Sequence, residues 1–171
     1  ECSGATALTV YGPTCGGVTN GTVGGATQSA PAITCNGFTG SSEDDVWYSF
    51  VATATAHDVT VIGSTNLNAV VEILSGACPG TNVSCADAIL TGGTEIINAT
   101  GLTIGSTYFV RVYDYDTIAP ATTAFTICSS SRPINPLSPA WGLSPKTAIL
   151  GLLIPKSFRR EFSINNNFRS I

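Results

Sequence analysis

The first 131 residues of this 171-residue chain contain no lysine and no methionine, and Arg111 is their single basic residue. The chain has 11 acidic and 7 basic residues, but they are unevenly placed. Residues 1–131 hold 11 − 1 = 10 acids and one base, a formal charge of −9, whereas residues 132–171 hold 7 − 1 = 6 bases and one acid, or +5. Neutralising phosphates needs clustered Lys and Arg, so we expect the acidic region not to bind nucleic acid.

Long apolar runs are also missing. The longest, AILGLLIP at 148–155, is far shorter than the roughly 20 residues that a membrane-spanning helix needs, so we expect no transmembrane segment. The first residues lack the charged and apolar regions of a signal peptide. We therefore expect a processed piece of a larger polypeptide, with neighbouring domains as partners.

Signatures of catalysis are scarce. His57 is the only histidine, it stands beside Asp58 at the start of a candidate strand, and no G-x-S-x-G nucleophile elbow occurs. We expect His57 to be a solvent-facing strand residue and the protein not to be an enzyme.

Residues 1–131 are rich in Thr, Gly, Ala, Val and Ser, which favours strands and turns over helices. Short alternating or β-branched segments recur between Gly, Asn and Pro residues. The eight candidate strands are 5–12, 18–27 (a weak edge candidate), 46–52, 57–63, 69–76, 94–101, 106–115 and 124–130. This spacing predicts an all-β fold, a two-sheet antiparallel sandwich.

Alternation along 106–115 places Tyr108, Val110 and Val112 on one face and Phe109, Arg111 and Tyr113 on the other. The second face is either covered by a neighbouring loop or open as a binding surface. We expect Arg111 to be held by Glu72 or by an Asp, as buried or half-buried Arg usually is.

The six cysteines form no C-x-x-C pair, which indicates disulfides in an oxidised, extracellular domain rather than a zinc or redox site. Pro79, Gly80 and Asn82 suit a tight loop, so we pair Cys78 with Cys85. Cys2 and Cys128, at opposite ends of the acidic region, could then join its first strand to its last, leaving Cys15 with Cys35; the alternative is that one or two cysteines are buried thiols.

Five segments, in order, carry a family resemblance: DDVWYSF at 44–50, AVVEILSG at 69–76, the loop from Cys78 to Cys85, TGLTIGSTYFVRVYDYD at 100–116 and AFTIC at 124–128. Residues 1–130 resemble the bacterial pre-peptidase C-terminal domain, in the cysteine-rich form found in surface proteins exported by the type IX route. The resemblance implies a jelly-roll-like sandwich that serves as a non-catalytic accessory or adhesion module, secreted or at the cell surface, beside peptidases, adhesins or glycan-active enzymes.

A calcium site is one hypothesis, since carboxylate oxygens are the ligands that Ca²⁺ prefers. The candidate ligands are Glu43, Asp44, Asp45, Asp114 and Asp116. Some relatives with this type of sandwich bind calcium, although Asn68 stands where many carry an acid. The alternative is that these acids are solvated charges at strand ends.

Glycan or protein binding is the second hypothesis, because aromatic faces stack on sugars and anchor protein partners. The candidate ligand-binding residues are Trp47, Phe109, Arg111, Tyr113 and Tyr115. The alternative is that most of them pack in the core. Thr117, in a D-T-I triplet, resembles an O-glycosylation site of the bacteria that use the type IX route.

Residues 131–171 contain five prolines and lack strand alternation. We interpret them as a basic, Pro-rich tail that is disordered or non-native.

Overall fold

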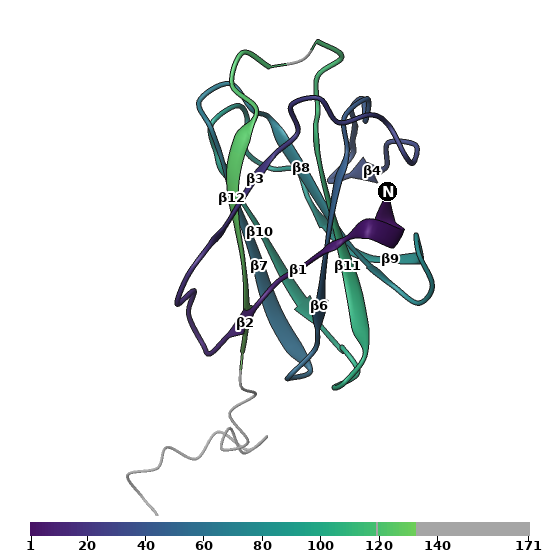
Figure 1. Ribbon diagram of the computed structural model, residues 1–171, viewed down its shortest axis with the longest axis vertical. Helices are drawn as coiled ribbons and strands as arrows, with labels where there is room; N and C mark the ends of the chain where they lie inside the picture. The colour runs from purple at the N-terminus through teal and green to yellow at the C-terminus, as the bar shows by residue number, and fades with distance from the viewer. Residues whose placement is uncertain (119, 133–171) are drawn as a thin grey trace, which may run out of the picture. The chain divides into compact units, whose positions relative to one another are not determined.

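The alternating segments of the sequence form strands in the computed structural model, which describes residues 1–118 and 120–132. Two sheets pack face to face (Figure 1). Sheet A has the order β1 (Thr6–Ala7), β6 (Val46–Val51), β11 (Thr107–Asp114), β8 (Ala69–Ser75) and β9 (Thr81–Ala86). Sheet B has the order β10 (Thr94–Thr100), β7 (Ala56–Gly63), β12 (Ala124–Ser131) and β2 (Val10–Tyr11), and β3 (Thr19–Thr22) also pairs with β12. The predicted all-β, two-sheet sandwich is confirmed.

The N-terminal segment joins both sheets. The predicted strand 5–12 is two short strands: β1 pairs parallel to β6 in sheet A, and β2 pairs parallel to β12 in sheet B. A 3-10 turn, η1 (Cys2–Gly4), precedes them. These two pairings are parallel, while the other pairings within the two sheets among the described residues are antiparallel.

The core lies between the sheets and follows the predicted alternation. Tyr108, Val110 and Val112 of β11 face inward, as expected, beside Val71 and Ile73 of β8. Val59, Val61 and Ile127 of sheet B are completely buried against them. Burying apolar side chains of this size stabilises a fold by about 1.5–3 kcal/mol each, so this core is the main source of stability.

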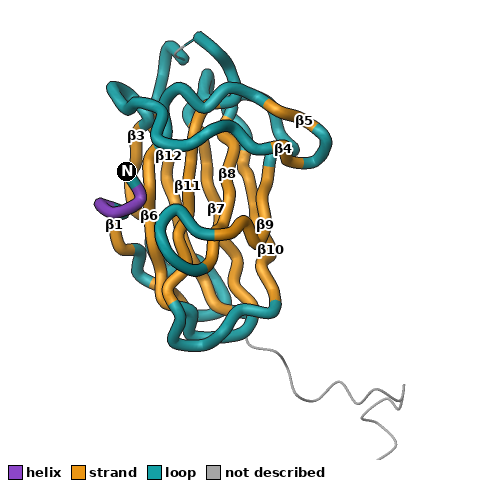
Figure 2. The backbone as a smooth tube through the Cα atoms, turned by 90° about the vertical axis from the view of Figure 1, so that its right-hand side faces the viewer, coloured by secondary structure: helices purple, strands orange, loops and turns teal. Residues whose placement is uncertain are grey.

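A third, two-stranded sheet and one strand of sheet A were not expected from the sequence. The hairpin of β4 (Thr34–Cys35) and β5 (Phe38–Thr39) turns at Asn36 and Gly37, whose φ angles are 51° and 90°. Figure 2 shows this hairpin at the upper end of the sandwich, and there β8 begins and β11 ends. Strand β9 occupies the segment that we had assigned to a tight disulfide loop.

The disulfide pairing differs from the prediction. All six cysteines are bonded, but as Cys2–Cys78, Cys15–Cys128 and Cys35–Cys85. Residues 81–86 form an extended strand that rises about 3.3 Å per residue, which carries Cys85 away from Cys78 and beyond the reach of a disulfide. Each bond instead joins segments far apart in the sequence.

His57 is buried, not solvent-facing as expected. Its Nε2 accepts hydrogen bonds from the backbone N–H groups of Thr53, at 3.1 Å, and Ala54, at 3.2 Å. Burial lowers the pKa of His57, although the nearby Asp58 charge acts in the opposite direction. The imidazole is therefore a structural acceptor that fixes the turn before β7.

Strand β12 runs to Ser131, and Arg132 follows it with a 2.7 Å ion pair to Asp58. The remainder of the predicted basic tail lies outside the described residues.

Candidate functional site

Arg111 stands at the centre of the outer face of sheet A and is fully buried there. Its guanidinium lies 2.7 Å from a carboxylate oxygen of Asp45 and 3.0 Å from one of Glu72. It also donates to the backbone carbonyls of Pro31, at 2.9 Å, and Ala30. The expectation that Glu72 or an Asp holds Arg111 is confirmed, since both do. The segment that contains these carbonyls covers the outer face of the sheet.

Asp45 fixes the covering segment to the sheet. It accepts hydrogen bonds from the Ser29 hydroxyl, at 2.6 Å, and from the backbone N–H groups of Ser29 and Ala30, at 3.0 and 3.1 Å. Trp47 Nε1 donates to the Ser29 hydroxyl oxygen at 2.8 Å. Burial alone would raise the pKa of Asp45, but the hydrogen bonds from Ser29 and the charge of Arg111 outweigh burial and lower it. Asp45 is therefore ionised and fully satisfied.

This arrangement corrects the predicted ligand-binding set. Trp47, Arg111 and Tyr113 are 5%, 0% and 0% exposed, because the segment before β6 lies over them. Arg111 and Tyr113 cannot contact a ligand without displacement of that segment, whereas the small exposed part of Trp47 lines an open pocket of about 360 Å³ near the N-terminus. Phe109 is half-buried against Trp47 in a small apolar cluster. Tyr115 lines a second cavity, as described below.

The five predicted calcium ligands do not gather in one place. Asp45 is bound to Arg111, while Glu43 and Asp116 are exposed. Asp44 and Asp114 are neighbours, since Asp44 Oδ1 accepts the Asp114 N–H at 3.1 Å. Within residues 1–118 and 120–132, no group of three or more His, Cys, Asp or Glu side chains is placed to hold a metal ion.

Asp114 is the most strongly perturbed of these acids. Burial raises its pKa to about 6, and the nearby Asp44 charge adds to the effect, while a 2.9 Å hydrogen bond from the Asn68 N–H opposes it. Asp114 Oδ2 is buried with no hydrogen-bond partner among the described residues. Burial also raises the pKa of Asp44. The negative charges of Asp44 and Asp114 are therefore poorly compensated by hydrogen bonds or cations, in contrast to that of Asp45.

A cavity of about 280 Å³ opens beside this pair, between the β4–β5 hairpin, the loop after β9 and the ends of β8 and β11. Its walls are mainly apolar. Its lining residues are Phe38, Asn68, Asp87, Ala88, Ile89, Leu90 and Tyr115. We call it the end pocket. Phe38 and Leu90 form its exposed rim, at 59% and 78% exposure, and Tyr115 is half-buried.

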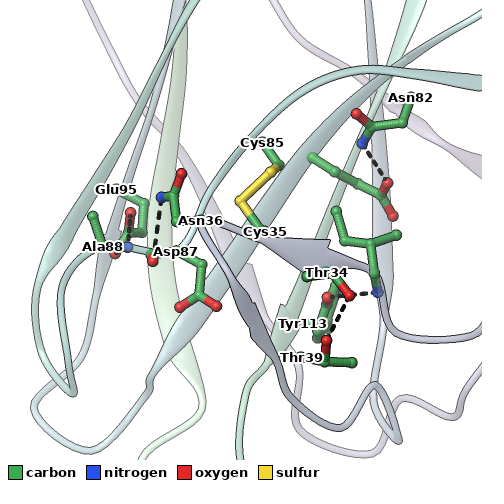
Figure 3. The surroundings of a disulfide bond; sticks show 12 residues. Thr34, Cys35, Asn36, Thr39, Asn82, Cys85, Asp87, Ala88, Glu95 and Tyr113 are labelled. Atoms are coloured by element: carbon green, nitrogen blue, oxygen red, sulfur yellow. Dashed lines mark hydrogen bonds between the residues drawn. A yellow bond between two sulfur atoms is a disulfide. The ribbon is translucent and has the colours of Figure 1, made fainter.

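Two bonds fix the hairpin wall of the end pocket (Figure 3). The disulfide between Cys35 and Cys85 joins β4 to β9. Asn36, in the hairpin turn, donates from its side chain to the backbone carbonyl of Asp87 at 3.4 Å. The hairpin that carries Phe38 is thereby held against the loop that carries Asp87.

Glu95 of β10 fixes the opposite wall, which is the loop after β9. Its carboxylate accepts the backbone N–H of Ile89 at 2.7 Å and that of Ala88 at 3.1 Å, the latter bond drawn in Figure 3. Burial raises the pKa of Glu95, and these two hydrogen bonds oppose the rise. The loop that shapes the end pocket is thus bonded directly to sheet B.

Tyr115 is positioned by a close backbone approach. The Ser41 N–H donates to the Tyr115 carbonyl at 2.7 Å, and the Tyr115 N–H donates to the Asn68 carbonyl at 2.8 Å. A Cβ on Gly40 would lie 2.6 Å from the Tyr115 carbonyl oxygen, so only glycine fits there. Thr117, the predicted glycosylation site, is exposed in the loop that follows.

The end pocket contains two buried polar side chains, Asp87 and Asn68, which are 8% and 7% exposed. Burial raises the pKa of Asp87, and no hydrogen bond within the described residues lowers it. Asn68 Oδ1 is likewise buried without a partner in the described part of the chain. The end pocket therefore offers one carboxylate without a protein donor, on an apolar background, while the Asn68 oxygen is enclosed behind its wall.

Sequence reasoning missed Phe38, Asp87 and the loop after β9 as site residues. One available signal was the Asn-Gly pair at 36–37, because a type I′ turn requires positive φ at both positions and typically joins two hairpin strands. No comparable local signal marks Asp87. Its role depends on β9, β10 and the hairpin meeting in space.

Comparison with known proteins identified one family and one solved structure similar to the chain. A family model described as galactose binding domain-like, of the type associated with the type IX secretion system, matches residues 1–127. A solved structure, the pre-peptidase C-terminal domain of a collagenase from Bacillus anthracis, matches with 14% identity and a TM-score of 0.45, over 73% of this chain and 95% of that one. No curated protein matches the chain.

The family and the three disulfides together place the protein outside the cell or at its surface. The family is one of accessory and binding domains. Among residues 1–118 and 120–132, no helix is long and apolar enough to span a membrane.

Proposed function

Because the chain belongs to the galactose-binding-domain-like family associated with type IX secretion, we propose that it is a non-catalytic module that binds a glycan in the end pocket. In this role it positions or attaches a larger secreted protein, and adhesion is one consequence. The proposal rests on one observation above all. A preformed cavity combines aromatic and apolar walls with the carboxylate of Asp87, which receives no hydrogen bond from the described residues.

This combination matches the two faces of a sugar ring. The C–H face of a sugar packs on aromatic and aliphatic side chains, here Phe38, Tyr115 and Leu90, and its hydroxyl groups donate to a carboxylate such as that of Asp87. The cavity volume of about 280 Å³ is at the small end for ligand sites, which favours a single ring over an extended chain.

The non-catalytic part of the proposal is supported by His57. Both backbone N–H groups of the preceding turn occupy its Nε2, so this histidine is not free to act as a general base.

A glycan array followed by isothermal titration calorimetry tests the proposal. We expect binding to at least one saccharide, with Tyr115→Ala and Phe38→Ala each weakening it at least tenfold. Ile96→Ala is the matched control, because Ile96 is also half exposed, at 50%, but lies on β10 outside the end pocket. If the array is empty while pull-downs from the cell envelope yield a protein, the ligand is a protein instead. Saccharide binding that survives both aromatic substitutions would move the site elsewhere.

A second candidate function is a calcium-stabilised recognition domain. It is favoured by the buried, unpartnered Asp114 Oδ2 beside Asp44, an arrangement that a cation would neutralise. These two carboxylates fit Ca²⁺ in part, and backbone carbonyls or water would complete the six to eight oxygens that it takes. Asp45 is excluded, since Arg111 holds it.

Thermal melting with excess chelator and with millimolar Ca²⁺ tests this second candidate. A ligand that binds only the folded state must raise the melting temperature. We expect an increase in the wild type that Asp114→Asn abolishes and that Asp116→Asn, a neighbouring exposed acid, retains. Equal midpoints with and without calcium would exclude the site.

A further inference from the structure

The end pocket is unusual in the balance of its hydrogen-bonding groups. Asp87 is more than nine-tenths buried, and burial alone raises its pKa, because no protein donor faces its carboxylate within the described residues. Asn68 adds a second buried oxygen without a partner in the described structure. Burying a carboxylate without a donor is costly. A ligand that brings donors, and ideally positive charge, would remove that cost.

The protein has no cation available for this role in the part of the chain that the structure describes. Two basic side chains occur there. Arg111 is bound between Asp45 and Glu72 on the outer face of sheet A, and Arg132 pairs with Asp58 after β12. The surroundings add further negative charge, since Asp44 and Asp114 lie next to Asn68. The countercharge for Asp87 therefore has to come from the ligand.

We infer that the saccharide bound in the end pocket carries a free primary ammonium group, as an unacetylated amino sugar does. This inference rests on the proposed glycan-binding function and names its ligand class. An ammonium has three donors and no acceptor, which complements the Asp87 carboxylate in the lining of the end pocket. The aromatic rings of Phe38 and Tyr115 attract a cation as well as the ring that carries it.

The same chemistry disfavours other sugars. Acetylation of the amine removes its positive charge and two of its three donors, so the ion pair with Asp87 is lost and one amide N–H remains. A neutral hexose offers hydroxyl donors without charge. Uronic acids and sulfated sugars meet an uncompensated carboxylate in a region with a formal charge of −9 (one base minus ten acids in residues 1–131).

Calorimetry with matched oligosaccharides tests the inference. A glucosamine tetramer, an N-acetylglucosamine tetramer, a glucose tetramer and a lysine-containing peptide are compared at about pH 6.5, below the pKa of a typical amine. We expect the glucosamine tetramer to bind about tenfold more tightly than its acetylated form, and more weakly as salt is added.

Two pairs of variants locate the preference. Asp87→Asn keeps the shape of the side chain, and we expect it to bring the affinities for the glucosamine and N-acetylglucosamine tetramers within about twofold of each other. Asp116 is an exposed acid beside Tyr115, and we expect Asp116→Asn to leave the preference for the glucosamine tetramer intact. Leu90→Lys places an ammonium on the exposed rim of the end pocket, and we expect it to lower the affinity for the glucosamine tetramer at least fivefold. Leu90→Gln is its uncharged control. Because Leu90 is 78% exposed, this pair is expected to fold normally.

The outcomes separate the inference from the function beneath it. Equal affinity for the free and acetylated tetramers overturns the ammonium inference and leaves glycan binding intact. A preference that survives Asp87→Asn also overturns it. If the three saccharides all fail to bind while the lysine peptide binds, the ligand is a protein, and both the inference and the proposed function are wrong.

Discussion

Two buried acidic regions of this domain differ in how their charge is compensated. On the outer face of sheet A, Asp45 and Glu72 share Arg111, and Asp45 also receives three hydrogen bonds from the covering segment. In the end pocket, Asp87 is buried to a similar degree with no donor from the described residues. The first arrangement fixes one segment of the chain on another. The second leaves a carboxylate without a hydrogen-bond donor from the protein, so that a ligand can supply one, as in a binding site.

The largest expected effect comes from breaking the compensated region. Arg111→Leu leaves two buried carboxylates without a countercharge, and the loss of one partner from such a buried network costs about 3–5 kcal/mol of unfolding free energy. Urea denaturation measures it. Arg132→Leu is the control, because its ion pair with Asp58 is partly exposed and contributes at most about 1 kcal/mol. Similar losses in the two variants would contradict the distinction between them.

The second largest effect concerns the attachment of the pocket wall. Replacing Cys35 and Cys85 together by serine is expected to cost about 2–4 kcal/mol and to abolish ligand binding, since the β4–β5 hairpin loses its bond to β9. The matched control replaces Cys15 and Cys128, whose bond closes a longer loop and involves sheet B. That variant is expected to be destabilised to a similar degree but to bind ligand at temperatures where it is folded. Loss of binding in both variants would show that the hairpin has no special part in the site.

Parts of this comparison could be predicted from the sequence, because they depend on local alternation. The pattern of strand β11 placed Val110 in the core and Arg111 on the opposite face, and the excess of acids made a carboxylate partner for Arg111 certain to be near. The segments that became strands β6, β7, β8, β10, β11 and β12 were located for the same reason.

The end pocket could not be predicted in this way, because it depends on contacts between distant segments. Asp87 gains its environment from Glu95, which holds the following loop, and from the Cys35–Cys85 bond across 50 residues. Disulfide partners are set by the tertiary fold and not by local spacing, so the turn-forming residues between Cys78 and Cys85 led to a wrong pairing of these two cysteines. The aromatic residues Trp47 and Tyr113 were misassigned because alternation does not reveal that a loop covers the outer face of a sheet.

A smaller effect is expected at Asp114, whose buried and poorly compensated charge should make the stability of the domain depend on pH. A raised pKa, here about 6, means that the folded state binds a proton that the unfolded state, near 3.8, has released. Stability from this group is therefore present below about pH 4, falls as the pH rises to about 6 and stays low above it. Asp114→Asn removes that decline, so with chelator present we expect it to be about 3 kcal/mol more stable than the wild type at pH 7 and to differ from it by less than about 1 kcal/mol at pH 4. A difference that is constant from pH 4 to 7 would exclude this explanation.

The smallest effect is the change in stability caused by Asp87→Asn, which we compare directly with that of Asp45→Asn. Asp87→Asn removes a buried charge that no protein group compensates, so in the absence of ligand we expect a gain of up to about 1 kcal/mol at pH 7. Asp45→Asn removes a charge whose pKa is lowered by its partners, so its sign is opposite, with a loss at pH 7 that shrinks as the wild-type carboxylate is protonated in acid. Paired urea titrations of the two variants at pH 7 measure both signs. Destabilisation by Asp87→Asn without ligand would mean that Asp87 serves the fold, as Asp45 does, and the end pocket would lose its strongest claim to be a binding site.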